Sequence, residues 1–102
     1  MTDIEYYRMK QSRNYVLTIN NPEITLSELL DVFRRNGAIK AIAQLEKGEN
    51  GTPHFQCFIG FKEARKFGGV KKAFPTAHIE AARNAYDAWQ YCQKLESRVE
   101  PP

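Results

Sequence analysis

AIKAIAQLEKGENGTPHFQCFIGF, residues 38–61, is the segment whose hydrophobic pattern best indicates the fold class. Apolar and polar residues alternate on both sides of the turn-forming segment KGENGTP, which predicts two paired strands over 38–46 and 53–61. Side chains alternate between the two faces of a strand, so one face of this hairpin is apolar and faces the core. The predicted core set is Ile39, Ala41, Ala43, Leu45, Phe55, Cys57, Ile59 and Phe61.

The segments around the hairpin complete an α+β pattern. β-Branched and aromatic residues predict a strand over 14–20, and apolar residues at helical spacing predict a helix that starts near Thr25 or Ser27 and ends at Asn36. A second helix is expected over 64–73, a short strand over 77–80 and a last helix over 83–95. The order β-α-β-β-α-β-α predicts a ferredoxin-like, or RRM-like, antiparallel sheet with an extra C-terminal helix.

Composition fits one compact domain. The chain has 102 residues, of which 42% are hydrophobic and 26% are charged, a balance typical of a globular protein. No apolar run approaches the length of a membrane span, so a membrane partner is not expected. Cys57 and Cys92 have neither metal-ligand nor C-x-x-C spacing, which argues against a zinc knuckle and a disulfide framework.

The face of the hairpin opposite the core carries a candidate metal site. Glu46 is on this face of the first strand, and His54 and Gln56 are on the same face of the second. Strand pairing would bring Glu46 close to the start of the second strand, where His54 lies. Two oxygen donors and one imidazole suit Mn²⁺ or Mg²⁺. A single histidine at a strand start is more often an ordinary surface or hydrogen-bonded residue, so that alternative stays open.

The last predicted helix places Asp87, Tyr91 and Lys94 in one stripe, at i, i+4 and i+7. A carboxylate, a phenol and an ammonium group beside a metal would form a reactive site. By themselves, however, a tyrosine on an amphipathic helix usually packs and a lysine one turn later is usually solvated.

Basic residues are concentrated in part of the chain. The net charge is +3, and residues 62–72 contain five basic side chains and one acid. Such a run either contacts nucleic acid phosphates or forms a solvated helix face. On the basis of charge, the candidate residues for nucleic-acid contacts are Arg13, Lys66 and Lys72.

Three segments, in this order, resemble the HUH-type nucleases of small circular single-stranded DNA viruses, the replication initiators of circoviruses, nanoviruses and geminiviruses. The first motif corresponds to VLTINNP at 16–22, the second to His54-Phe55-Gln56, and the third, Tyr-x-x-Lys, to YCQK at 91–94. Gln56 stands where the superfamily has a second histidine and is similar to the variant in the circovirus and nanovirus branch. Metal binding is therefore expected to be weaker than with two imidazoles.

The resemblance implies a sequence-specific endonuclease and strand transferase that acts on single-stranded DNA at a viral replication origin and initiates rolling-circle replication. Tyr91 is the implied nucleophile, which forms a covalent 5′-phosphotyrosine, and Lys94 is expected to assist it. Glu46, His54 and Gln56 are expected to hold Mn²⁺ or Mg²⁺. Thr18 and Asn20, in the first motif, are expected along the DNA path.

The same resemblance implies that these residues are the N-terminal part of a longer protein with a helicase domain, self-association of the full-length protein and action in the host nucleus. No P-loop motif occurs in the sequence, so ATP-dependent unwinding is not expected of these residues. The rival interpretation is a non-catalytic RRM-like module that binds single-stranded nucleic acid. A third is a phosphodiesterase that uses water, in which Tyr91 would have no covalent role.

Overall fold

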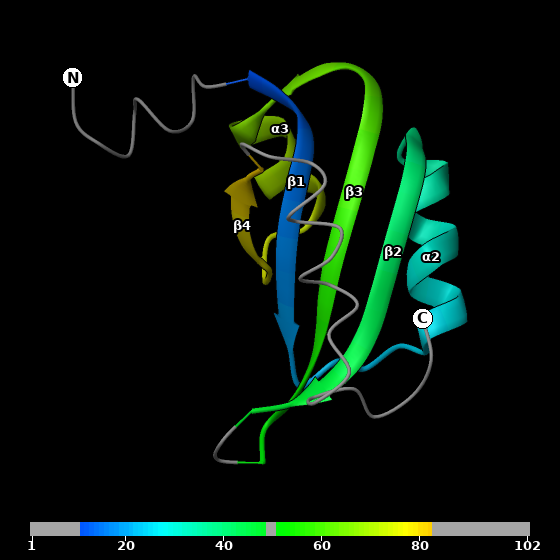
Figure 1. Cartoon of the computed structure of the whole chain (residues 1–102), viewed down its shortest axis with the longest axis vertical. Coiled ribbons are helices and arrows are strands. Elements are labelled where there is room, and N and C mark those ends of the chain that lie inside the picture. The colour runs from blue at the N-terminus through cyan, green and yellow to red at the C-terminus, as the bar shows by residue number, and fades with distance from the viewer. Residues whose placement is uncertain (1–10, 49–50, 83–102) are drawn as a thin grey trace, which may run out of the picture.

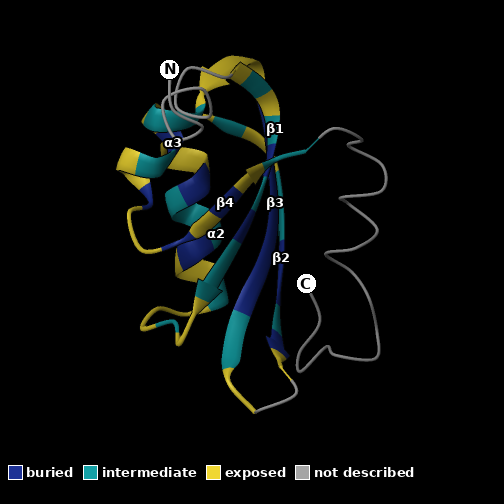
Figure 2. Ribbon diagram, turned by 90° about the vertical axis from the view of Figure 1, so that its left-hand side faces the viewer, coloured by how far each residue is buried: buried dark blue, intermediate teal, exposed yellow. Residues whose placement is uncertain are grey.

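The computed structural model describes residues 11–48 and 51–82. The elements follow in the order β1 (Gln11–Asn20), α2 (Leu26–Arg35), β2 (Ala38–Lys47), β3 (Pro53–Lys66), α3 (Phe67–Ala73) and β4 (His78–Ala81). The strands form one antiparallel sheet in the order β2-β3-β1-β4, and both helices cover the same face (Figure 1, Figure 2). The predicted α+β, ferredoxin-like core is confirmed. The last predicted helix, 83–95, lies outside the described residues.

The hydrophobic core fills the space between the sheet and the two helices. Phe33 of α2 and Phe74, directly after α3, meet edge to face with ring centroids 5.3 Å apart, which ties the two helical segments together. The predicted alternation of β3 is confirmed because Phe55, Cys57 and Ile59 all belong to the buried cluster. The cluster consists of Tyr15, Leu17, Leu29, Phe33, Ala43, Phe55, Cys57, Ile59, Phe61, Val70, Phe74, Ala77 and Ile79.

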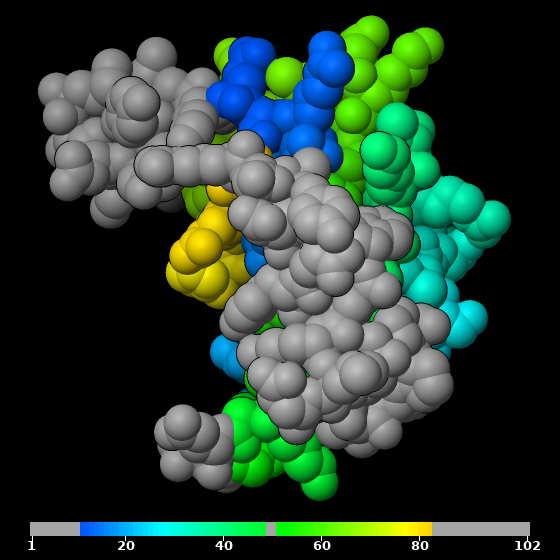
Figure 3. Space-filling view, viewed as in Figure 1, coloured from blue at the N-terminus to red at the C-terminus, as the bar shows by residue number. Residues whose placement is uncertain are grey.

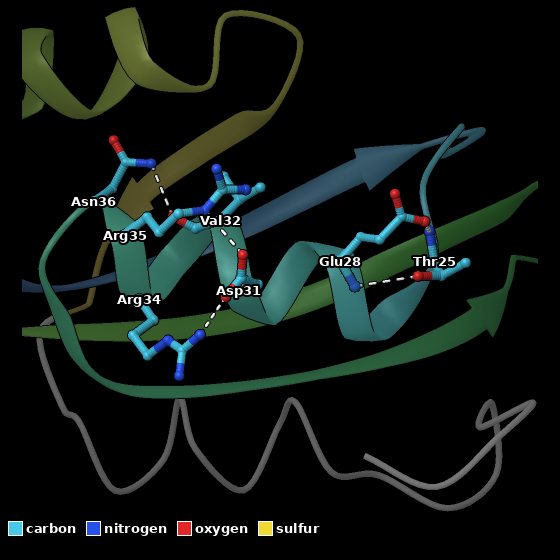
Figure 4. Close-up of polar contacts among 7 residues, drawn as sticks. All are labelled: Thr25, Glu28, Asp31, Val32, Arg34, Arg35 and Asn36. Atoms are coloured by element: carbon cyan, nitrogen blue, oxygen red, sulfur yellow. Dashed lines mark hydrogen bonds and ion pairs between the residues drawn. The ribbon is translucent and has the colours of Figure 1, made fainter.

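Helix α2 begins and ends where the sequence predicts. The Thr25 hydroxyl accepts a hydrogen bond from the Glu28 backbone N–H, and the Glu28 carboxylate accepts one from the Thr25 backbone N–H, both at 3.1 Å (Figure 4). The hydrogen bond from the Thr25 backbone N–H, followed by the interaction with the Thr25 side chain, lowers the pKa of the exposed Glu28 carboxyl. Such a reciprocal capping box satisfies two of the N–H groups that a helix start leaves unpaired. After the last turn, Gly37 adopts a φ of +94°, which glycine tolerates best.

The second predicted helix is wrong over residues 64–66, because these residues continue strand β3. Lys66 pairs with Gln11 and Arg65 with Ser12, so β1 also starts earlier than the predicted residue 14. Helix propensity is a weak preference that strand pairing overrides here. Helix α3 is therefore a short element, Phe67–Ala73.

Three side-chain contacts hold this extension of β3 in place, one of which is a hydrogen bond from Arg65 Nη1 to the Asn36 carbonyl oxygen at 3.3 Å. The Tyr15 hydroxyl donates a hydrogen bond to the Arg65 carbonyl oxygen at 2.6 Å. The Arg65 guanidinium lies over the Phe61 ring, 4.4 Å from its centroid, a favourable cation–π arrangement. The basic run 62–72 is thus divided between a strand and a short helix and is not the single helix face considered above.

The predicted core position of Ile39 is also wrong. The pairing of β2 with β3 shifts register between Ala38 and Lys40, and Ile39 in this irregularity is 63% exposed. An extra residue in one strand reverses the alternation on one side of it. From Ala41 onward the predicted faces are correct. Strand β4, predicted over 77–80, is shifted by one residue.

Candidate metal centre

Alternation along the paired strands places polar side chains on the second face of the sheet, turned away from α2 and α3, at the hairpin end of β2 and β3. Two cross-strand rows make up this group. Glu46 of β2 and Asn20 of β1 both pair with His54 of β3, and the next row runs through Gln56. Directly paired residues lie about 4.5–5.5 Å apart, so the two rows are compact. The polar patch consists of Thr18, Asn20, Gln44, Glu46, His54 and Gln56.

Glu46 and His54 face each other across β2 and β3, as the alternation predicted. The Glu46 Oε1 and His54 Nε2 atoms are 3.3 Å apart, and Glu46 is only 1% exposed. His54 Nδ1 lies 3.4 Å from the Thr52 carbonyl oxygen. When Nδ1 carries the proton and donates it to that carbonyl, the Nε2 lone pair points toward the carboxylate. In this tautomer two electron donors face one another, which is the arrangement that a cation would stabilise. In the other tautomer the Nε2–H group donates a hydrogen bond to Oε1.

Gln56 is the third predicted ligand and lies one row away from His54 on the same face. It is 4% exposed, and the Thr18 hydroxyl donates a hydrogen bond to its Oε1 at 3.2 Å. A carbonyl oxygen has two lone pairs, so this bond leaves one for another partner. Thr18, from the first motif, therefore orients the amide of Gln56, in the second motif.

The spacing of one donor pair suits a small divalent ion. In an octahedral site with ligand distances of about 2.1 Å, neighbouring donor atoms lie about 3 Å apart. The separation of 3.3 Å between Glu46 Oε1 and His54 Nε2 is close to that value. Among residues 11–48 and 51–82, no group of three His, Cys, Asp or Glu side chains is arranged to hold a metal, so the third donor in this region would be the Gln56 amide.

Gln44 is a member of the patch to which the sequence assigned no role. It is fully buried, at 0% exposed, and its Nε2 donates a hydrogen bond to Glu46 Oε2 at 2.5 Å. The signal that could have found it is its spacing, two residues before Glu46 on the same face of a strand. A buried carboxylate needs such donors, because an unpaired buried charge is costly.

The predicted nucleic-acid residues do not form one group. Thr18 and Asn20 belong to the polar patch, whereas Arg13 and Lys66 lie toward the opposite end of the sheet, where the start of β1 runs beside the end of β3 (Figure 3). Lys72 lies on α3. Arg13, Lys66 and Lys72 are all exposed and form no ion pair with another described residue.

Tyr91 and Lys94, the predicted catalytic residues, and Asp87 beside them lie outside the described residues. Their assignments stay predictions from the sequence. In the part of the chain that the structure describes, no helix is both long and apolar enough to span a membrane.

Comparison with known proteins places this chain in a family. Residues 12–95 match the family model Viral_Rep, which describes viral replication proteins. The Replication-associated protein of Beak and feather disease virus is 36% identical over 83 residues, which cover 80% of this chain and 29% of that protein. The Master replication protein of Milk vetch dwarf virus (isolate N) is 34% identical over 91 residues, covering 86% of this chain and 29% of that protein.

A third relative, the Replication-associated protein of Pigeon circovirus, is 33% identical over 88 residues, or 85% of this chain and 28% of that protein. The chain thus spans less than a third of the length of each of these relatives. The family match covers most of the chain and includes β1, the hairpin and the polar patch. This chain belongs to the family of viral replication proteins.

Proposed function

We propose that this chain is the nicking domain of a viral replication initiator, a metal-dependent endonuclease and strand transferase that acts on single-stranded DNA at a replication origin. Family membership supports a role in viral replication. The observation that carries the chemistry is the pair of donor atoms, Glu46 Oε1 and His54 Nε2, that face one another at 3.3 Å beside Gln56.

These three side chains would hold one Mn²⁺ or Mg²⁺ ion. When bound, the ion supplies Lewis-acid polarisation of a phosphate oxygen and stabilises the charge that develops there. The polar patch supports this assignment in two ways. Gln44 and Thr18 hold the Glu46 carboxylate and the Gln56 amide in fixed orientations, which reduces the cost of organising the ligands.

The proposed reaction exchanges one phosphate ester for another. The Tyr91 hydroxyl oxygen attacks the phosphorus in line and forms a phosphotyrosine bond, while the bond from phosphorus to the 3′ oxygen breaks. The 3′ end leaves as a hydroxyl, so the phenol proton is transferred overall to the leaving oxygen. Because the bonds formed and broken are alike, the reverse reaction rejoins the strand. Lys94 would neutralise charge on the phosphate.

The non-catalytic RRM-like alternative requires exposed aromatic side chains on the central strands for base stacking. Phe58 is the aromatic residue on the second face of the described strands, and it is 2% exposed. Burial leaves little ring surface for stacking a base, which favours the catalytic interpretation.

The test is a denaturing gel of the protein incubated with a single-stranded origin oligonucleotide labelled on the 3′ side of the cleavage site. The proposal predicts a labelled protein band that requires Mn²⁺ or Mg²⁺ and Tyr91. The matched control omits the ion and adds a chelator. Binding of the oligonucleotide with neither a covalent band nor cleavage would favour the RRM-like module, and cleavage without the band would favour hydrolysis by water.

A further inference from the structure

Gln44 forms a buried hydrogen bond with Glu46, one of the proposed metal ligands. Its amide nitrogen donates to Glu46 Oε2 at 2.5 Å, and both residues are almost completely buried. An ionised carboxylate oxygen only accepts hydrogen bonds, so the amide must present its nitrogen and not its oxygen. Within a buried region such a charge-assisted bond is strong, because little water competes for the same atoms.

The two oxygens of Glu46 therefore have different partners. Oε2 is engaged by Gln44, whereas Oε1 lies 3.3 Å from His54 Nε2. A carboxylate held in this way can offer Oε1 to an ion beside His54, while Oε2 is directed toward the amide. Oε2 keeps a second lone pair, but the bond from Gln44 fixes the direction of the carboxylate. Turning both oxygens toward an ion beside His54 would lengthen or break that bond.

A carboxylate that binds through one oxygen suits different ions from a carboxylate that binds through both. Mg²⁺ demands near-ideal octahedral geometry at about 2.0–2.1 Å, whereas Ca²⁺ accepts about 6–8 oxygen ligands and often takes both oxygens of a carboxylate. The hydrogen bond to Oε2 would thus penalise the larger ion, and it would hold Oε1 in the orientation that the smaller ions need.

We propose that Gln44 is a positioning residue that restricts Glu46 to a one-oxygen ligand and so selects Mn²⁺ or Mg²⁺ over Ca²⁺. This inference rests on the proposed metal centre and deepens it, because it assigns ion selectivity to a residue that would not touch the ion. The position of Gln44 strengthens the argument. It pairs with Gln56 across β2 and β3, so strand pairing fixes its backbone relative to a second proposed ligand.

The experiment measures Mn²⁺ and Ca²⁺ affinities calorimetrically for the wild-type protein and for Gln44→Met, which keeps a long side chain and removes the donor. We expect Mn²⁺ affinity to fall by about tenfold, as for other residues that orient metal ligands. Ca²⁺ affinity should fall much less, or rise, so that the ratio of the two affinities decreases. A purely structural role would weaken both ions in parallel and leave the ratio unchanged.

A second variant covers the case in which Gln44→Met does not fold. Gln44→Asn keeps a buried amide but withdraws its nitrogen from Glu46 by one methylene, and it should reduce the affinity ratio in the same direction. An unchanged ratio in a folded variant would overturn the selectivity assignment while leaving the metal centre intact. If the wild-type protein binds neither ion, the proposed metal centre fails as well, so the two failures are distinguishable.

Discussion

The two ends of strand β3 differ in charge, in burial and in the regularity of their pairing. At the first end, His54 and Gln56 lie in a continuous register with β1 and β2, among partners that are neutral or acidic. At the last end, Lys62, Arg65 and Lys66 are exposed, and the pairing with β1 is interrupted by a register shift. One strand thus separates a group of side chains suited to a cation from a group suited to phosphate.

The distance between the ends makes this separation effective. Gln11 and Asn20, which pair with Lys66 and His54, are nine residues apart on β1, a separation of roughly 30 Å at about 3.3 Å per residue. Charges are screened over about 8 Å at physiological ionic strength, so basic residues at the far end barely repel a cation at the polar patch. Substitutions at one end should therefore leave the measurement that reports on the other end unchanged.

The largest expected effect is that of Tyr91→Phe. This change removes one oxygen and keeps the ring, so nicking, joining and the covalent adduct should all fall below detection while binding of single-stranded DNA is retained. Gel assays with a labelled origin strand measure the first three, and fluorescence anisotropy measures binding.

Tyr86 is the matched control for this prediction. If the predicted helix forms, Tyr86 is rotated from Tyr91 by about 140°, so the two hydroxyls cannot both face one ion. Tyr86→Phe should keep substantial activity. Recovery of a DNA-linked peptide that contains Tyr86 would show that the nucleophile has been assigned to the wrong residue.

The next effect in size concerns the polar patch. His54→Ala removes the imidazole that faces Glu46 Oε1 at 3.3 Å, and Mn²⁺ affinity should fall by more than about tenfold, the lower range for residues that only support ligands. The salt dependence of DNA binding should not change, because the basic end is untouched. Calorimetric titration tests the first statement, and equal Mn²⁺ affinities for the two proteins would exclude His54 as a ligand.

Most of this patch follows from the sequence, because its placement depends on alternation alone. Glu46, His54 and Gln56 occupy the same face as predicted, since no register shift separates Glu46 from Ala41 in the pairing with β3. Beyond the shift, at Ile39, the same rule gives the wrong face. The hydrophobic pattern of one strand cannot reveal a β-bulge, because the extra residue is recognised only by comparison with the paired strand.

The remaining errors arise where tertiary contacts decide the secondary structure or the partner of a side chain. Residues 64–66 contain good helix formers, but their pairing with β1 and the hydrogen bond from Tyr15 hold them in a strand. The contact between Gln44 and Glu46 was missed for a related reason. Alternation shows that it shares a face with Glu46, yet it does not say which side-chain atoms meet.

Tyr15→Phe tests the far end of β3 with a smaller effect. It removes the donor to the Arg65 carbonyl and should reduce the free energy of unfolding by about 1 kcal/mol, the usual net value of such a bond. Mn²⁺ affinity should stay within experimental error, because the polar patch keeps its register. Chemical denaturation with and without Mn²⁺ checks both statements. A marked loss of Mn²⁺ affinity would mean that the two ends are coupled.

The smallest effect is expected from Lys66→Ala. Lys66 is exposed at the last residue of β3 and, among the described residues, forms no ion pair, so its ammonium group is free to approach a phosphate. Each phosphate contact to a single strand contributes about 0.7 to the slope of log affinity against log salt. Losing one contact should reduce the slope by about that amount and leave Mn²⁺ affinity unchanged.

Lys71 is the matched control because it carries the same charge as Lys66 but forms a hydrogen bond within the protein. Its Nζ donates a hydrogen bond to the Ala77 carbonyl oxygen at 2.6 Å, which connects α3 to the segment before β4. Lys71→Ala should therefore lower thermal stability and alter the salt slope less than Lys66→Ala does. If neither substitution changes the slope, and Arg13→Ala and Lys72→Ala do not either, the basic residues at these positions only keep the surface solvated. The separation of the two ends of β3 would then have no function in DNA binding.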